Sequence, residues 1–173
     1  MKAKRMAYLL LVALILSVSC SRNASSTIPI GEQELPDMVM EDALYVLGQP
    51  EEKPLFLKAQ KITIWSSQRG TMLENVSFER SDEFSGSCTS AVIRSDSRHA
   101  VLSGDVLIHQ NADDITIMTQ SIVWDQDTES FTCDGEVTMQ YGQGTTLKAL
   151  GFYAKFDEGL YEFAQILEGR MSE

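Results

Sequence analysis

Apolar and polar residues alternate along most of the chain beyond residue 35, and no segment longer than a few residues keeps a helical period. Alternation with a period of two, rich in β-branched and aromatic residues, is typical of antiparallel strands that bury one face. The clearest such segments are LKAQKITIW (57–65), ENVSFER (74–80), DVLIHQ (105–110), DITIMTQ (114–120), SIVWD (121–125) and EVTMQY (136–141). Short polar segments such as SSQRG, QNADD and FDEG separate the strands and favour turns. We therefore predict an all-β protein of about nine to thirteen short strands.

A repeat of about 30 residues underlies this alternation. Val76, Val106, Val137 and Ile166 are separated by 30, 31 and 29 residues, and each follows a polar residue. A strand-turn-strand unit of this size cannot bury its apolar face alone. Stacked copies therefore predict an elongated antiparallel sheet folded on itself, with one row of apolar residues per repeat facing inward.

The stretches VLSGDVLIHQ and TCDGEVTMQY share a glycine, an acidic residue and a valine within this repeat. We interpret Gly104 and Gly135 as structural turn residues that permit a bend between repeats. Their acidic neighbours, Asp105 and Glu136, are then solvated and do not form a metal or phosphate site.

The alternation also predicts which side chains face the interior. A register error of one residue on any strand would flip that strand's face, so each assignment depends on its own strand. The predicted interior row is Ile62, Ile64, Val76, Phe78, Ile93, Val106, Ile108, Ile115, Ile117, Ile122, Trp124, Val137, Met139, Leu147, Phe152 and Phe156.

The N-terminus has the basic, apolar and small-residue order of a secretory signal. Its uncharged run, residues 6–21, is short of the roughly 20 residues that span a bilayer. The small-residue segment that ends at Cys20 resembles a bacterial lipoprotein signal, in which the cysteine is lipidated. We expect a signal peptide at 1–19, a lipidated Cys20 with a flexible tether at 20–34, and one domain at 35–173. The alternative is an uncleaved N-terminal helix that anchors the protein.

The protein is strongly acidic, with 14 Lys and Arg against 25 Asp and Glu and a net charge of −11. Loss of the three cations at residues 2, 4 and 5 with the signal peptide would take −11 to −14. Such a surface repels nucleic acid, so nucleic-acid binding is disfavoured. Cys88 and Cys133 are interpreted as buried small apolar residues, and a single disulfide is the alternative.

No motif for catalysis, a cofactor or a metal stands out. His99 and His109 have no cysteine or carboxylate at metal-ligand spacing and are expected on solvent faces near turns. NADD (111–114) lacks the glycine and the closing glutamate of a calcium loop, and GQGTT (142–146) does not begin a helix that could hold phosphate. We expect a protein that is not an enzyme and binds no cofactor. An apolar ligand groove and an ordinary closed core both fit the alternating rows.

The order and spacing of several segments resemble the LptC family of lipopolysaccharide export proteins, which is related to LptA and OstA-type domains. The segments are the N-terminal anchor, LPDMVMEDALYVL, PLFLKAQKITIW, LENVSFE, LSGDVLIHQ, ITIMTQSIVWD and FTCDGEVTMQYGQGTTLKALGFYAKFD. The resemblance covers Leu35 to about Gly169. No single motif in it is specific, and the cysteine at the anchor departs from the many members that keep a transmembrane helix.

The resemblance implies a twisted antiparallel β-jellyroll, open at its ends, whose apolar interior row holds the acyl chains of lipopolysaccharide or a similar glycolipid. It also implies three partners: inner-membrane ABC transporter subunits that supply the lipid, an LptA-like periplasmic jellyroll protein that pairs edge strand to edge strand, and the membrane. The expected location is the periplasmic face of the inner membrane. The alternative is a structural or interaction lipoprotein of the cell envelope that binds no lipid.

Overall fold

The computed structural model describes residues 35–48, 53–66, 70–81, 83–94, 98–142 and 144–171. The chain divides into two units, Met1–Glu34 and Leu35–Glu173, and every described residue belongs to the second. The predicted signal peptide (1–19), Cys20 and the tether (20–34) therefore lie outside the described residues.

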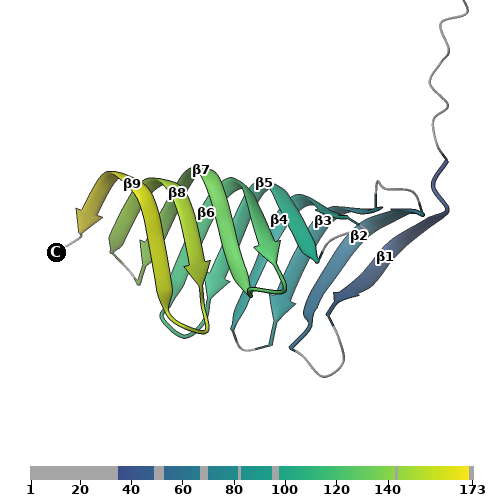
Figure 1. Cartoon of the computed structure of the whole chain (residues 1–173), viewed down its shortest axis with the longest axis horizontal. Helices are drawn as coiled ribbons and strands as arrows, with labels where there is room; N and C mark the ends of the chain where they lie inside the picture. Colours follow the sequence, from purple (N-terminus) through teal and green to yellow (C-terminus); the bar gives the residue numbers. More distant parts are fainter. Residues whose placement is uncertain are drawn as a thin grey trace, which may run out of the picture. The chain divides into compact units, whose positions relative to one another are not determined.

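The described part of the second unit is a single sheet of nine antiparallel strands in which each strand pairs with its neighbour in the sequence, from β1 to β9 (Figure 1). The all-β prediction is confirmed. The strands are β1 (Met38–Leu47), β2 (Leu55–Trp65), β3 (Gly70–Arg80), β4 (Phe84–Ile93), β5 (His99–Gln110), β6 (Ile115–Asp125), β7 (Ser130–Tyr141), β8 (Thr145–Lys155) and β9 (Leu160–Met171).

The strands are longer than the segments that the alternation marked. The alternation is interrupted at a bend in the middle of a strand, so one strand was read as two segments. DITIMTQ and SIVWD, for example, are the two halves of β6. The pairing register shifts at these bends in the later strands, between Ser87 and Ser90, Ser103 and Val106, Thr119 and Val123, Cys133 and Glu136, and Lys148 and Ala149. Such β-bulges bend a strand and increase its twist, so a row of them folds one sheet into two facing halves.

Gly104 and Gly135 lie at these bends and not at turns between strands, which corrects the sequence interpretation. Gly104 is in the middle of β5 and has a φ of +77°, a backbone conformation that L side chains rarely adopt. A Cβ added there would lie 2.7 Å from the side chain of Thr89. Gly135 is in the middle of β7, where an added Cβ would meet only the Cys133 sulfur at 3.8 Å. The bend therefore requires glycine at residue 104 and not at residue 135.

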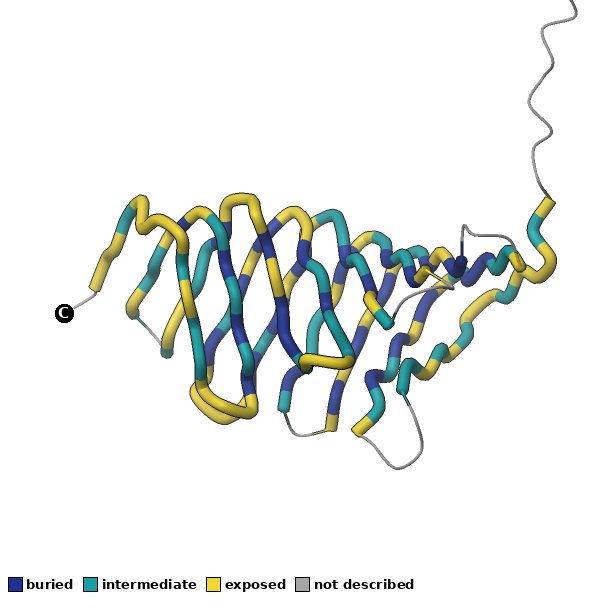
Figure 2. The backbone as a smooth tube through the Cα atoms, in the orientation of Figure 1, coloured by how far each residue is buried: buried dark blue, intermediate teal, exposed yellow. Residues whose placement is uncertain are grey.

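The core fills the space between the two halves of the sheet, and Figure 2 shows buried positions along strands β2 to β8. Thirteen of the sixteen predicted interior residues are buried, as the alternation predicted. The other three, Ile64, Met139 and Leu147, are half-buried. They lie near strand ends, where the interior meets solvent.

Replacing Gly104 with alanine tests the bend. We expect Gly104→Ala to lower the free energy of unfolding by about 2–4 kcal/mol, because it adds a steric clash to an unfavourable φ. Gly159→Ala is the matched control, since Gly159 has a φ of +62° and no atom within 4 Å of an added Cβ. It should cost only about 1 kcal/mol. Urea unfolding followed by circular dichroism measures both, and equal losses would contradict the steric account.

Candidate functional site

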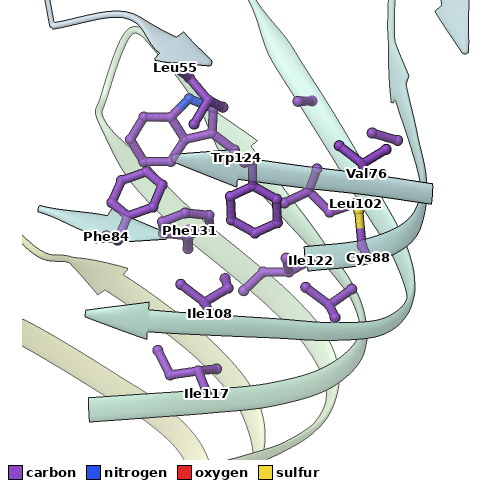
Figure 3. Packing of buried hydrophobic residues seen from close by; sticks show 14 of the residues in the cluster. Leu55, Val76, Phe84, Cys88, Leu102, Ile108, Ile117, Ile122, Trp124 and Phe131 are labelled. Atoms are coloured by element: carbon purple, nitrogen blue, oxygen red, sulfur yellow. The ribbon is translucent and has the colours of Figure 1, made fainter. Parts of the chain in front are cut away.

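The two rims formed by the strand ends meet at an aromatic contact. Phe84 begins β4 on the rim that carries the β3–β4 turn, whereas Trp124, Phe131 and Phe156 lie on the opposite rim, at the ends of β6, β7 and β8. The ring centroid of Phe84 is 5.3, 5.0 and 5.5 Å from those of Trp124, Phe131 and Phe156. Figure 3 shows Phe84 beside Trp124 and Phe131 in the interior. We call this four-residue contact the seam.

A buried arginine joins the same two rims by polar contacts. The side chain of Arg80, only 5% exposed, forms ion pairs with Glu129 in the β6–β7 turn and with Glu83, 3.4 Å away in the β3–β4 turn. Its Nε donates to the Lys53 carbonyl at 3.0 Å, and its guanidinium lies 5.4 Å from the ring centroid of Trp124. We call Arg80, Glu83 and Glu129 the clasp. Burial of an unpaired guanidinium is unfavourable, so these contacts stabilise the charge of Arg80 beside the aromatic seam.

The seam joins the start of β4 to the opposite rim at β6 to β8, and beyond it the inward-facing residues in the second half of β9 are exposed. The exposure of the aligned residues of the 30-residue repeat differs accordingly. Val76, Val106 and Val137 are 2%, 1% and 0% exposed, but Ile166 is 61% exposed. Ile166 pairs with Ala149, which is buried, and directly opposed residues share a face of the sheet. Ile166 therefore points into the interior and is exposed because β9 is the last strand.

Neighbouring inward-facing residues of β7 to β9 extend this exposed apolar surface. Met139 and Tyr141 pair with the buried Ile117 and Ile115, and Leu147 pairs with Met139. Directly paired side chains share a face, so all three face the interior. We call the set the C-terminal trough, which consists of Met139, Tyr141, Leu147, Phe163, Ile166 and Met171. Tyr141, Ile166 and Met171 are exposed, and the others are half-buried.

Inward-facing apolar residues are also exposed at the β1 end. Met38 and Met40 pair with Ile64 and Ile62, so they face the interior, and Met38 is exposed. The interior between the two ends of the sheet is packed with buried side chains. A depression of about 600 Å³ on the outer face of β5 to β7 is lined by Leu107 and Met118 together with Asp105, Gln120 and Glu136. This mixed lining does not match an apolar chain, whereas the residues of the C-terminal trough do.

Sequence reasoning found most of the interior, including Trp124 and Phe156 of the seam, but missed the other two seam residues, Phe84 and Phe131. Phe84 was missed because β4 reads FSGSCTSAVI, in which small residues hide the alternation. Phe131 and the inward residues of β9 were also absent from the predicted row. Isolated aromatic residues next to a turn, such as Phe84, Phe131 and Phe156, are the one sequence signal that could have marked the seam.

The remaining candidates for chemistry are two cysteines and two histidines. Cys88 and Cys133 are buried and unpaired, and burial raises the pKa of Cys88 to about 11, so its thiol is unreactive at neutral pH. His99 and His109 lie at strand ends, 3.6 Å from Asp125 and 4.0 Å from Asp114. Among the described residues, no group of three or more His, Cys, Asp or Glu side chains could hold a metal ion. The same residues include no helix long and apolar enough to cross a membrane.

These features define a class of protein: an open antiparallel β-roll with an apolar interior and two open ends. The sequence matches the family model described as "Lipopolysaccharide-assembly, LptC-related" over residues 7–170. The chain therefore belongs to the LptC-related family of periplasmic, non-enzymatic proteins of lipopolysaccharide transport.

The fold agrees with a solved relative. The chain is similar to LptH of Pseudomonas aeruginosa, the LptA-homologous periplasmic component of the lipopolysaccharide transport device, with a TM-score of 0.55. The two share 9% sequence identity, and the match covers 65% of this chain and 83% of LptH. At that identity the likeness establishes the β-jellyroll fold alone. No match is found among curated proteins.

Removing the clasp tests whether it holds the rims together. We expect Arg80→Leu to lower the free energy of unfolding by about 2–4 kcal/mol, because it takes the guanidinium away from the carboxylates of Glu129 and Glu83 at the edge of the core, where Glu83 keeps its ion pair with Lys53. Arg170→Leu is the control, since that side chain is 79% exposed and its ion pair with Glu168 lies on the surface. It should change stability by less than about 0.5 kcal/mol. Thermal and urea unfolding measure both variants, and an equally small loss for Arg80→Leu would show that the clasp contributes nothing.

Proposed function

We propose that this protein is a membrane-anchored periplasmic component of lipopolysaccharide export. It binds lipopolysaccharide, or a related glycolipid, in its apolar interior and passes it from an inner-membrane ABC transporter to the next jellyroll protein. Family membership supports the transport role. The observation that carries lipid binding is the C-terminal trough, because an inward-facing apolar row that reaches solvent at one end of the roll offers an exit for acyl chains.

The edges of the sheet support handover by strand pairing. β1 and β9 are the edge strands of the sheet that the described residues form, so each presents a row of backbone groups on its outer side. An edge strand of another jellyroll that pairs with β9 would continue the sheet and extend the trough beside Ile166 and Met171. Acyl chains could then move between proteins without crossing water, and the energy for transport comes from the transporter.

Acyl chains that pass along the packed middle of the roll require it to open, and the seam is the weakest place. Elsewhere neighbouring strands are joined by continuous backbone pairing. Among the described residues, the seam and the clasp join the two rims through side chains. We infer that the rims part there to admit lipid, because side-chain contacts separate at a lower cost than backbone ladders.

The predicted N-terminus supplies the anchor in this proposal. Cys20, carrying more than one acyl chain, would hold the domain stably at the membrane, since each buried methylene contributes about 0.8 kcal/mol. Residues 20–34 would act as the flexible tether. An uncleaved N-terminal helix would serve the same purpose.

Photo-crosslinking in cells tests lipid binding. A photoreactive amino acid at Ile166 or Met139, in the trough, should form adducts with lipopolysaccharide several-fold more often than the same group at Leu107 or Met118. The last two side chains are partly exposed on the outer face, at 41% and 37%. Equal or absent lipid adducts at all four positions would contradict the proposal.

A second function is favoured by one observation, the tight packing of the interior between the two ends of the sheet. If the interior is only a closed core, the protein is a structural or interaction lipoprotein whose edge strands recruit an envelope partner. That alternative predicts protein adducts from β9 and no lipid adducts from the trough.

A further inference from the structure

Two hydrogen-bond donors in the interior have no partner. Among the described residues, the ring nitrogen of Trp124 and the hydroxyl of Tyr161 are the buried side-chain nitrogen and oxygen atoms that make no hydrogen bond. Trp124 is 2% exposed, and Figure 3 shows its ring nitrogen on the side of Leu55. Leaving a donor buried and unpaired is unfavourable, and proteins rarely do so without a purpose.

The two donors belong to one continuous row of aromatic rings. Trp124 is 4.7 Å from Phe131, Phe131 is 5.0 Å from Phe156, and Phe156 is 6.0 Å from Tyr161, measured between ring centroids. This row, which we call the aromatic ladder, follows one rim from β6 to β9. Trp124 lies at its clasp end. Tyr161 lies at its other end, on β9, where it pairs with the buried Ala154 and so faces the interior near the C-terminal trough.

The chemistry of the two donors limits what they can bind. An indole N–H donates only, and burial together with the nearby Asp113 raises the pKa of Tyr161 to about 12, so its hydroxyl stays protonated at neutral pH. Both donors are neutral, and the surrounding ladder is apolar. The Arg80 guanidinium beside Trp124 already pairs with Glu83 and Glu129, so a phosphate there would lose solvation and meet two carboxylates. An ester or amide carbonyl is a neutral acceptor that an alkyl chain carries inside.

We propose that Trp124 and Tyr161 form two hydrogen-bonding hooks for the ester or amide carbonyls that link acyl chains to the head of a lipid. The alkyl chains lie along the rings of the aromatic ladder between them. The hooks rest on the proposed function, since they require lipid in the interior, but they go beyond it. They explain how a roll lined with apolar side chains fixes the depth of a lipid and favours acylated lipids over simple alkyl chains.

The test compares two probes that differ only in their linkages. One is a monosaccharide phosphate with two ester-linked acyl chains, and the other is its counterpart with two ether-linked alkyl chains of the same length. The full chain is kept in a maltoside detergent, which has no carbonyl. We expect the ester probe to bind several-fold more tightly than the ether probe, because each hydrogen bond adds roughly two- to ten-fold in affinity.

Variants test whether the two donors cause the tighter binding of the ester probe. Trp124→Phe and Tyr161→Phe should each weaken the ester probe by roughly two- to ten-fold and leave the ether probe unchanged, and the double variant should bind both probes equally. The ether probe also controls for folding, because a damaged interior would weaken both. Trp65→Phe and Tyr153→Phe are matched controls on residues outside the ladder and should keep the full preference.

Nuclear magnetic resonance provides a direct readout. The protein has two tryptophans, so its indole N–H region has two signals, which Trp65→Phe assigns. The ester probe should move the Trp124 indole proton downfield, as a new hydrogen bond does, and the ether probe should not. If both probes bind equally and leave the Trp124 proton at the same position, the hooks are wrong and the proposed function stands. If neither probe binds and the trough gives no lipid adducts, the proposed function itself fails.

Discussion

Phe84 begins β4, yet its ring packs among three rings from the opposite ends of β6, β7 and β8. Nothing in the backbone pairing requires this contact, because the sheet runs from β1 to β9 without closing. Each strand bends at its middle, and the contact at Phe84 turns nine bent strands into a roll with an inside. Buried aromatic side chains contribute the largest apolar areas per residue, and their tilted pairs add roughly 0.5–1.5 kcal/mol each. The clasp at Arg80 fixes the same two rims with charge-assisted hydrogen bonds.

The position of that contact along the sheet decides where the interior opens. Because the first rim at β4 meets the second rim at β6 to β8, the second half of β9 lies beyond this contact. The same side-chain pattern that gives a closed core at Val106 and Val137 gives an exposed apolar surface at Ile166. An apolar surface of this kind beside an unpaired edge strand is a liability in a free protein, and it becomes useful when a partner strand covers it. The position of the seam along the sheet therefore decides both where the core is closed and where the C-terminal trough is exposed.

The alternation of apolar and polar residues predicted those features of the structure that depend on residues close together in the sequence. Alternation identified thirteen buried residues, because a half-buried strand must place apolar side chains on one face. It could not show that DITIMTQ and SIVWD form one bent strand, since a bulge inside a strand and a turn between strands both interrupt the period. The alternation could not predict the seam, for a different reason. Phe84 and Phe156 are far apart in sequence, and only the three-dimensional wrapping brings them to 5.5 Å. The unpaired donors of Trp124 and Tyr161 likewise follow from tertiary packing alone.

The central claim is that lipid enters where the two rims meet, and the distance across the seam measures it most directly. Spin labels at Ser81 in the β3–β4 turn and Asp127 in the β6–β7 turn sit on exposed positions of the two rims. Pulsed electron paramagnetic resonance gives the distribution of distances between them with and without saturating lipid A. We predict that lipid A lengthens and broadens this distribution, while a control pair on paired neighbouring strands stays unchanged. An identical distribution in the presence of bound lipid A would contradict the account.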